Sequence, residues 1–132
     1  MFMVKTALRP SPIEGLGVFA VEDIPKGTVV WEFNPVLDFV LDPKAIATLN
    51  AIGRDFVRRY TYLNRMSGKY VLCSDDSRYM NHSDTPNLVG FYPPGDIEGQ
   101  DVAARDIKAG EELTSDYRTF DDEFKIKLGG GA

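Results

Sequence analysis

Two stretches of the chain have a similar order of apolar and polar positions, and both predict short β-strands. Residues 19–27 (Phe-Ala-Val-Glu-Asp-Ile-Pro-Lys-Gly) resemble residues 102–110 (Val-Ala-Ala-Arg-Asp-Ile-Lys-Ala-Gly). In each copy a β run reaches Asp-Ile, a turn closes on Gly27 or Gly110, and a second β run follows. The pattern predicts two similar β-hairpins, one near each end of the domain.

The strongest helix signal begins at Asp42-Pro43. Asp42 is a suitable N-cap, and Pro43 suits the first helical position. An apolar face with three- and four-residue spacing follows, formed by Ile46, Leu49, Ile52, Phe56 and Tyr60. A short strand is expected at residues 70–73. One central helix among short strands predicts an α+β, mainly β fold. We expect a single domain over residues 1–128 and a flexible tail at residues 129–132.

Composition is that of a globular protein able to bury a core without cross-links. Of the 132 residues, 43% are hydrophobic and 27% are charged. No apolar run approaches the roughly 20 residues that cross a bilayer, so no membrane association is expected. The single cysteine, Cys73, excludes an internal disulfide and a multi-cysteine zinc site. A cytoplasmic location is therefore the default, with delivery to a host cell or a nucleus left open.

The charge balance bears on the partners that the protein can bind. The net charge is −5 and the pI is about 4.8. A nucleic-acid-binding protein normally carries a basic patch, so direct nucleic-acid binding is not expected. An acidic surface can attract lysine-rich peptides, although it can equally serve only to keep the protein soluble.

The densest polar positions fall in two runs. Residues 81–87 read Asn-His-Ser-Asp-Thr-Pro-Asn, and residues 112–117 read Glu-Leu-Thr-Ser-Asp-Tyr. Polar groups this dense are costly to order unless they bond to one another or to a ligand. Since apolar, strand-like stretches flank both runs, we expect a shared polar site inside a β-rich domain.

These runs, together with two shorter segments, resemble a SET domain. The resemblance is carried, in the family's order, by residues 15–20 (Gly-Leu-Gly-Val-Phe-Ala), 78–83 (Arg-Tyr-Met-Asn-His-Ser), 86–87 (Pro-Asn) and 110–117 (Gly-Glu-Glu-Leu-Thr-Ser-Asp-Tyr). It implies a protein lysine N-methyltransferase that uses S-adenosylmethionine and releases S-adenosylhomocysteine. It also implies a β-clip of small curled sheets with a C-terminal pseudoknot, and a lysine-containing protein or peptide as substrate.

The resemblance assigns residues to a cofactor site. Gly15, Leu16 and Gly17 would contact the methionine part of the cofactor, where a turn poor in side chains lets the ligand approach the backbone. Asn81 and His82 resemble the pair that holds the cofactor, with His82 also supporting the pseudoknot. No set of metal ligands is present, and the reaction needs none.

Tyr117 resembles the family's catalytic tyrosine, which also contacts the cofactor. Tyrosine is neutral at pH 7, so hydrogen bonding and positioning are its expected roles. A second tyrosine would line the lysine channel, and Tyr60 is favoured over Tyr62 although it also completes the predicted helix face. Ser115 stands where relatives often carry Phe or Tyr, which suggests a roomier pocket.

The sequence also departs from the usual family pattern, and the resemblance leaves some roles unassigned. Asp84 stands where many relatives carry cysteine, and the cysteine-rich segment that follows many SET domains is absent. Phe120 is our candidate for the aromatic that covers the adenine, with Phe124 as a second choice. Minimal relatives use a partner chain to complete the site, which leaves a homodimer open.

Two other interpretations compete with an active enzyme. A SET-like interaction or ligand-binding module without catalysis is favoured by Ser115 and by the short C-terminal segment. A β-clip domain unrelated to methyl transfer would explain the repeated Asp-Ile-x-x-Gly turns, but not the two polar runs. Cofactor binding separates the first of these from the enzyme.

Overall fold

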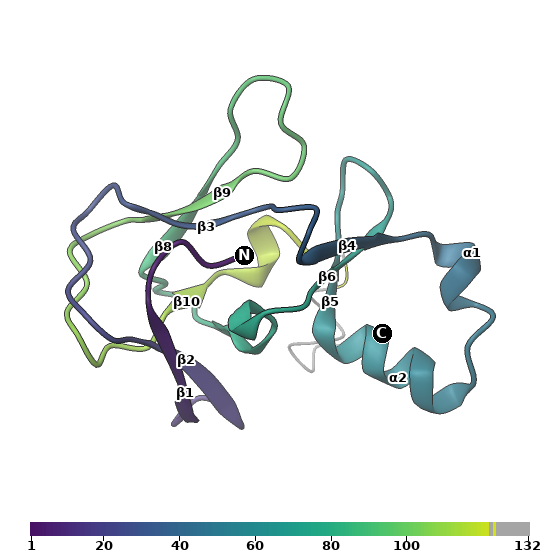
Figure 1. Ribbon diagram of the computed structural model, residues 1–132, viewed down its shortest axis with the longest axis horizontal. Coiled ribbons are helices and arrows are strands. Elements are labelled where there is room, and N and C mark those ends of the chain that lie inside the picture. Colours follow the sequence, from purple (N-terminus) through teal and green to yellow (C-terminus); the bar gives the residue numbers. More distant parts are fainter. Residues whose placement is uncertain (122, 124–132) are drawn as a thin grey trace.

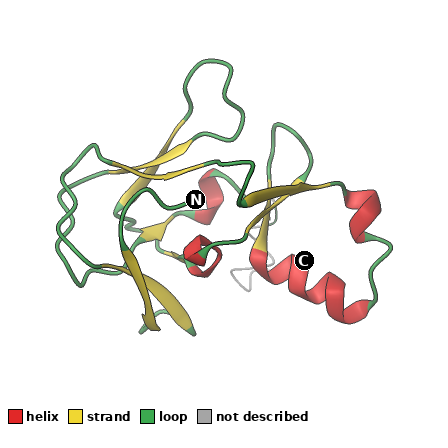
Figure 2. Cartoon of the chain, in the orientation of Figure 1, coloured by secondary structure: helices red, strands yellow, loops and turns green. Residues whose placement is uncertain are grey.

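The computed structural model describes residues 1–121 and 123. These residues form four small sheets and two short α-helices (Figures 1 and 2). In Figure 1 the helices lie on one side of the molecule beside β4, β5 and β6, while β1, β2, β3, β8 and β9 make up the other side. The predicted α+β, mainly β fold is confirmed.

The two sheets on the β-rich side are antiparallel and carry most of the core strands. β1 (Thr6–Pro10) pairs with β2 (Leu16–Ala20), and the loop between them closes through a hydrogen bond from Ser11 N to Gly15 O at 2.8 Å. The second sheet has the order β3-β9-β8, with bounds Val29–Glu32, Gln100–Ala103 and Leu88–Phe91.

A third antiparallel sheet contains the strand predicted at residues 70–73. Its order is β4-β6-β5, with bounds Asp38–Leu41, Tyr70–Cys73 and Thr61–Leu63. A 3₁₀ helix at Asp76–Tyr79 follows β6 and leads into the first polar run. This sheet supports the helices on one side and one wall of the candidate site on the other.

The fourth sheet joins the two polar runs. β7 (Asn81–His82) and β10 (Thr114–Ser115) form a short parallel pair in which Thr114 lies opposite Asn81 and Ser115 opposite His82. A second 3₁₀ helix at Tyr117–Thr119 continues from β10. The predicted pseudoknot requires this pairing, because the C-terminal run must lie beside the earlier one.

The repeated Asp-Ile-x-x-Gly segments pair with each other instead of forming two separate hairpins, so that prediction is wrong. Gly27 and Gly110 have φ angles of 87° and 90°, the left-handed conformation that glycine adopts without strain. The pairing satisfies the backbone groups of both turns through matched bonds. These are Gly27 N to Ala103 O and Gly110 N to Ala20 O, both 2.8 Å, and Lys26 N to Asp106 Oδ1 and Ala109 N to Asp23 Oδ1, at 2.8 and 2.9 Å.

This pairing also builds the main hydrophobic core. Ile24 and Ile107 bridge the two segments and are 2% and 1% exposed. They pack with six further buried residues from both halves of the chain: Val18, Ala20, Val30, Leu88, Ala103 and Leu113. A smaller core of Trp31, Val71 and Cys73 lies towards the third sheet.

The single central helix predicted from Asp42 is in fact two helices. Asp42 caps α1 (Pro43–Ile46) as expected, but Asn50 starts a second helix, α2 (Ala51–Tyr60), by accepting a hydrogen bond from Gly53 N. The predicted apolar face is not a core face either, because Ile52 is 80% exposed and Phe56 is 42% exposed. Val57 is the buried residue of α2. The two helices lie at one edge of the molecule. No other described element covers the apolar face that carries Ile52 and Phe56.

Two other expectations meet the limits of the described residues. The predicted tail at residues 129–132 and Phe124 lie outside them. Among the described residues, no helix is long and apolar enough to cross a membrane.

Candidate functional site

His82 links the two polar runs directly. Its Nδ1 accepts a hydrogen bond from Tyr117 N at 3.1 Å, so the ring proton lies on Nε2, which donates to Asp84 Oδ1 at 2.8 Å. The ring also packs edge-on against the Tyr117 ring, with centroids 5.3 Å apart. His82 thus fixes where the second 3₁₀ helix, and with it Tyr117, begins.

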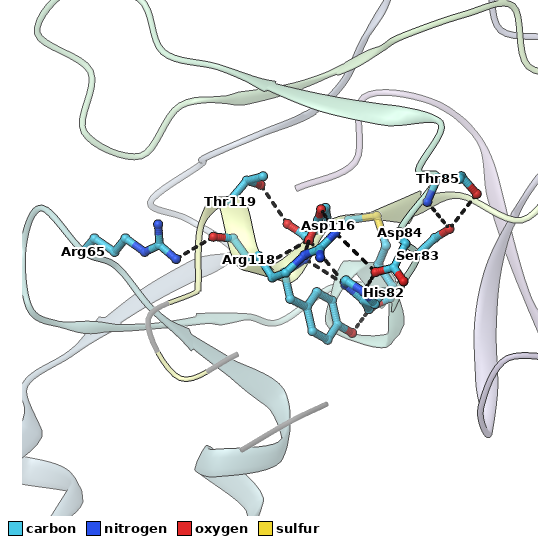
Figure 3. A network of polar contacts seen from close by, with 10 residues as sticks. Arg65, His82, Ser83, Asp84, Thr85, Asp116, Arg118 and Thr119 are labelled. Atoms are coloured by element: carbon cyan, nitrogen blue, oxygen red, sulfur yellow. Dashed lines mark hydrogen bonds and ion pairs between the residues drawn. The ribbon is translucent and has the colours of Figure 1, made fainter. Parts of the chain in front are cut away.

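A network of charged side chains lies at this junction (Figure 3). Arg118 pairs with Asp116 at 2.7 Å and with Asp84 at 3.3 Å. The Arg118 guanidinium holds the pKa of the Asp116 carboxyl below its ordinary value. Asp84, the residue that departs from the family pattern, is therefore part of the network that holds the two runs together.

Asn87 fastens the same runs from the interior. Its side chain is 3% exposed, donates to Glu112 O at 2.8 Å and accepts from Thr114 N at 2.9 Å. Asn87 therefore has a structural role at this junction. A buried amide with both ends bonded fixes the register of β10 against the first run.

Asn81 connects the first run to the β1–β2 loop. Its amide Nδ2 donates to Glu14 O at 3.1 Å, Leu16 O at 3.2 Å and Glu112 Oε2 at 2.9 Å. Glu112 is in turn held by the Ser11 hydroxyl at 2.8 and 2.9 Å. The backbone of residues 14–16 and the Asn81 side chain are therefore presented together.

Gly17 allows this arrangement. A Cβ atom at Gly17 would lie 2.3 Å from Glu112 Oε2, so any larger residue would displace the carboxylate. Gly15 has a φ of 47° and open space where its side chain would be. The two glycines of the Gly-Leu-Gly segment thus serve different purposes, one a close approach and the other a turn.

The first of two cavities lies between this loop and α2. It has a volume of about 540 Å³, and its lining includes Gly15, Leu16, Asn81 and Tyr117. Charged groups of both signs also line it: Glu14, Asp55, Arg58, Arg59 and Arg78. A ligand bound here would meet backbone, amide and charged groups at once.

The second cavity, of about 330 Å³, lies between the third sheet and the β8–β9 loop. Aromatic side chains from several elements line it: Trp31, Tyr60, Tyr62, Tyr92, Tyr117 and Phe120. Three carboxyl groups, those of Glu98, Asp101 and Asp121, also contribute to its wall. An aromatic cavity with carboxylates suits a cationic ligand.

Tyr117 and Tyr60 line both cavities, as do Met80, Arg59 and Arg78. The Tyr117 hydroxyl donates to Met80 O at 2.6 Å, which fixes its direction. Burial raises the pKa of the Tyr117 phenol above its ordinary value, helped by the carboxylates of Asp121, Glu14 and Glu112. The phenol is therefore neutral and oriented at the place where the two cavities meet.

The remaining predicted site residues lie at different depths. Gly17 and His82 are absent from the lining of either cavity and act behind it, whereas Phe120 lines the second cavity and not the first. Tyr62 lines only the second cavity, donates to Glu98 Oε2 at 3.2 Å, and packs edge-on against Phe120. Both tyrosines offered for the lysine channel thus reach the second cavity, Tyr60 at its junction with the first.

Sequence reasoning missed Trp31, Glu98 and Asp101 as site residues. Trp31 and Asp101 face each other across β3 and β9, strands that come from opposite ends of the chain. Nothing in their local sequence distinguishes them from ordinary strand residues, because only the pairing of these strands brings them to the cavity.

The chain matches the family model described as "SET domain" over residues 15–118. The chain belongs to the SET-domain family.

Curated relatives agree with this assignment. The chain is 32% identical over 133 residues to human Histone-lysine N-methyltransferase 2D and 29% identical over 141 residues to Histone-lysine N-methyltransferase trr of Drosophila melanogaster. Each match covers 95% of this chain but only 2% and 5% of the respective relative. The chain thus spans a small part of these relatives, which are histone-lysine methyltransferases by name.

Solved structures share the fold. A humanized mutant of the Polycomb Repressive Complex 2 of Chaetomium thermophilum, bound to an inhibitor, matches with a TM-score of 0.63 and 26% identity, covering 93% of this chain and 16% of that chain. An apo form of the complex, with two mutations in Ezh2, matches with a TM-score of 0.66 and 28% identity, covering 94% and 16%.

Proposed function

We propose that the protein transfers a methyl group from S-adenosylmethionine to the side-chain amine of a lysine in a protein or peptide. The observation that carries the proposal is the pair of cavities that meet at Tyr117 and Tyr60. Methyl transfer needs donor and acceptor to approach from opposite sides in line, and two adjoining cavities suit that requirement. Membership of the SET-domain family supports the same reaction.

The first cavity fits the cofactor by its chemistry. The Asn81 oxygen accepts no hydrogen bond from the described residues, since all three hydrogen bonds of this side chain are donated by its Nδ2. Gly15 and Leu16 offer backbone, and Glu14 and Arg78 offer opposite charges for a ligand with both an amino and a carboxylate group. S-adenosylmethionine, when bound, supplies a methyl group activated by its sulfonium.

The side chains of the second cavity act on the lysine. The neutral Tyr117 hydroxyl, held by Met80 O, positions the amine without acting as a fixed base. Only the neutral amine can attack the methyl group, so the bound lysine must lose its proton before transfer. Ser115, 4% exposed and lining this cavity, leaves room that a larger residue would fill.

An array of lysine peptides tests the proposal directly. Histone tails are the first substrates to include, because the curated relatives are named for them. Each peptide is printed beside a twin in which arginine replaces lysine, and the array is incubated with methyl-labelled S-adenosylmethionine. We expect label on lysine peptides and none on their twins. Cofactor binding without label on any lysine peptide would instead favour the interaction module without catalysis.

A further inference from the structure

We propose that Asp101 is the carboxylate that binds the ammonium group of the substrate lysine in the second cavity. The identity of the ligand as lysine rests on the proposed function, whereas the cation site itself does not.

Asp101 sits in the middle strand of the β3-β9-β8 sheet. Trp31 lies opposite it on β3, and Gly90 lies opposite it on β8. The residue is partly buried and lines the second cavity together with Tyr117. A carboxylate held in a central strand has little freedom to turn away towards solvent.

Asp101 differs from the other two carboxyl groups of the cavity. Glu98 accepts from Tyr62 Oη and Asn64 Nδ2, both at 3.2 Å, and Asp121 accepts from Leu63 N at 3.1 Å. No described group donates a hydrogen bond to the Asp101 carboxylate. A partly buried carboxylate without a protein donor has lost part of its hydration, so a bound cation with N–H donors would stabilise it.

The arginines of the cavity wall are held elsewhere. Arg78 stacks on the Tyr60 and Tyr79 rings, at 5.6 and 5.0 Å from their centroids. Arg59 lies over the Tyr60 ring at 6.0 Å, and Arg65 donates to Arg118 O. None of the three forms an ion pair with Asp101 in the described part of the chain. The site therefore has its anion but not its cation.

Three further polar atoms support a polar ligand in this cavity. Trp31 Nε1, Ser115 Oγ and Arg78 Nε are buried without a hydrogen-bond partner among the described residues, and all three residues line the cavity. Trp31 is 5% exposed and Ser115 is 4% exposed. Buried polar atoms are normally paired, so their presence here points to a polar ligand or to water that accompanies one.

The groups that face Asp101 make its protonation a useful reporter. Burial raises the pKa of the Asp101 carboxyl to about 7, and the N-terminal ammonium opposes this only in part. Burial raises the pKa values of the Tyr62 and Tyr92 phenols, helped by the Glu98 and Asp101 carboxylates, so both phenols are neutral near pH 7. A bound ammonium would stabilise the ionised carboxylate and lower its pKa.

The test uses n-butylammonium, which reproduces the side chain of lysine, and n-butanol as a neutral control of similar size. Carboxyl ¹³C resonances are followed by NMR from pH 4 to pH 9, with potassium chloride matching the ionic strength. We expect the Asp101 midpoint to fall from about 7 to about 6 or below with n-butylammonium only. An unchanged midpoint with n-butylammonium, or an equal fall with n-butanol, would overturn the proposal.

Variants locate the effect. Asp101→Asn should abolish the saturable n-butylammonium shifts of neighbouring resonances, while Glu98→Gln, whose parent carboxylate already has donors, should keep them. Equal binding by Asp101→Asn and the parent protein would also overturn the proposal. Calorimetry with S-adenosylmethionine on the same samples separates the two hypotheses. Failure of cofactor binding in the parent would count against methyl transfer, and the NMR shift would still decide the ammonium site.

Discussion

At the scale of single residues, Tyr117 is the central residue of the proposed site. Its backbone is fixed by His82, its hydroxyl by Met80 O, and its ring lies where the two cavities meet. Three independent constraints on one side chain are more than packing alone requires. They are what a residue needs in order to position reacting groups.

Tyr117→Phe should lower the rate of methyl transfer about 100- to 1000-fold, the usual effect of removing one oriented donor from an active site. Cofactor binding should stay near that of the parent, because the ring and its packing against His82 remain. The rate is measured by mass spectrometry on the best peptide from the array. A fully active Tyr117→Phe variant would rule out this role for the hydroxyl.

Asp101 should cost the protein stability at neutral pH. Its carboxyl ionises near its ordinary pKa of 3.8 in the unfolded chain but only at about 7 in the folded protein. The unfolded state therefore binds fewer protons between these values, so this contribution to stability falls as pH rises from about 4 to about 7. Asp101→Asn removes it and should stabilise the protein at pH 8 by up to roughly 4 kcal/mol.

Urea unfolding at pH 4 and pH 8 measures this difference, since the other titrating groups contribute equally to both proteins. The stability gain of Asp101→Asn over the parent should be larger at pH 8. A gain that is equal at both pH values would show that the Asp101 carboxyl is not shifted as described.

The sequence alone predicts Asn81, His82 and Tyr117 as site residues, because each stands in a run whose order is specific to the family. Asp101 and Trp31 could not be found in this way. Their importance depends on β3 and β9 being neighbours, which joins residues far apart in the chain. A local pattern carries no information on such a pairing.

At the scale of elements, the Gly-Leu-Gly segment and β10 depend on each other. Gly17 allows Glu112 to approach, Glu112 holds the Asn81 amide, and Asn81 holds the backbone of Leu16. The β1–β2 hairpin and the first polar run are therefore one unit. A substitution at any of these residues should alter the shape of the first cavity.

Gly17→Ala should destabilise the protein by about 1–3 kcal/mol, because the new Cβ would overlap the Glu112 carboxylate. It should also weaken cofactor binding about tenfold, the equivalent of one lost hydrogen bond. Gly90→Ala is the matched control in another strand, where a Cβ would come no closer than 3.4 Å to the Tyr92 side chain. Thermal unfolding and calorimetry measure both effects, and similar losses in the two variants would contradict the role given to Gly17.

The helix and the repeats show where element prediction from sequence stops. The apolar spacing from Ile46 to Tyr60 is compatible with one helix. The side chain of Asn50 nevertheless caps a second helix, so the first helix ends before it. The repeated turns were recognised correctly as turns, yet their hydrogen-bond partners are each other. Period and turn chemistry are local, whereas the partner of a strand is chosen by the whole fold.

At the scale of the whole molecule, a small domain holds two cavities by folding two similar segments against each other. Ile24 and Ile107 close the core between these segments, and the sheets around them carry the walls of the site. The motifs predicted this fold class through the family resemblance. Whether two copies associate stays a prediction, which light scattering on the purified protein can test.

The most direct test of the account is a calorimetric titration with S-adenosylmethionine of the parent protein, Asn81→Ala and Asn50→Ala. We predict saturable binding at one site, lost in Asn81→Ala because the first cavity loses its amide. Asn50→Ala should still bind, since Asn50 only caps α2 and does not line the cavity. Absence of binding by the parent, or equal binding by Asn81→Ala, would contradict the assignment of the first cavity to the cofactor.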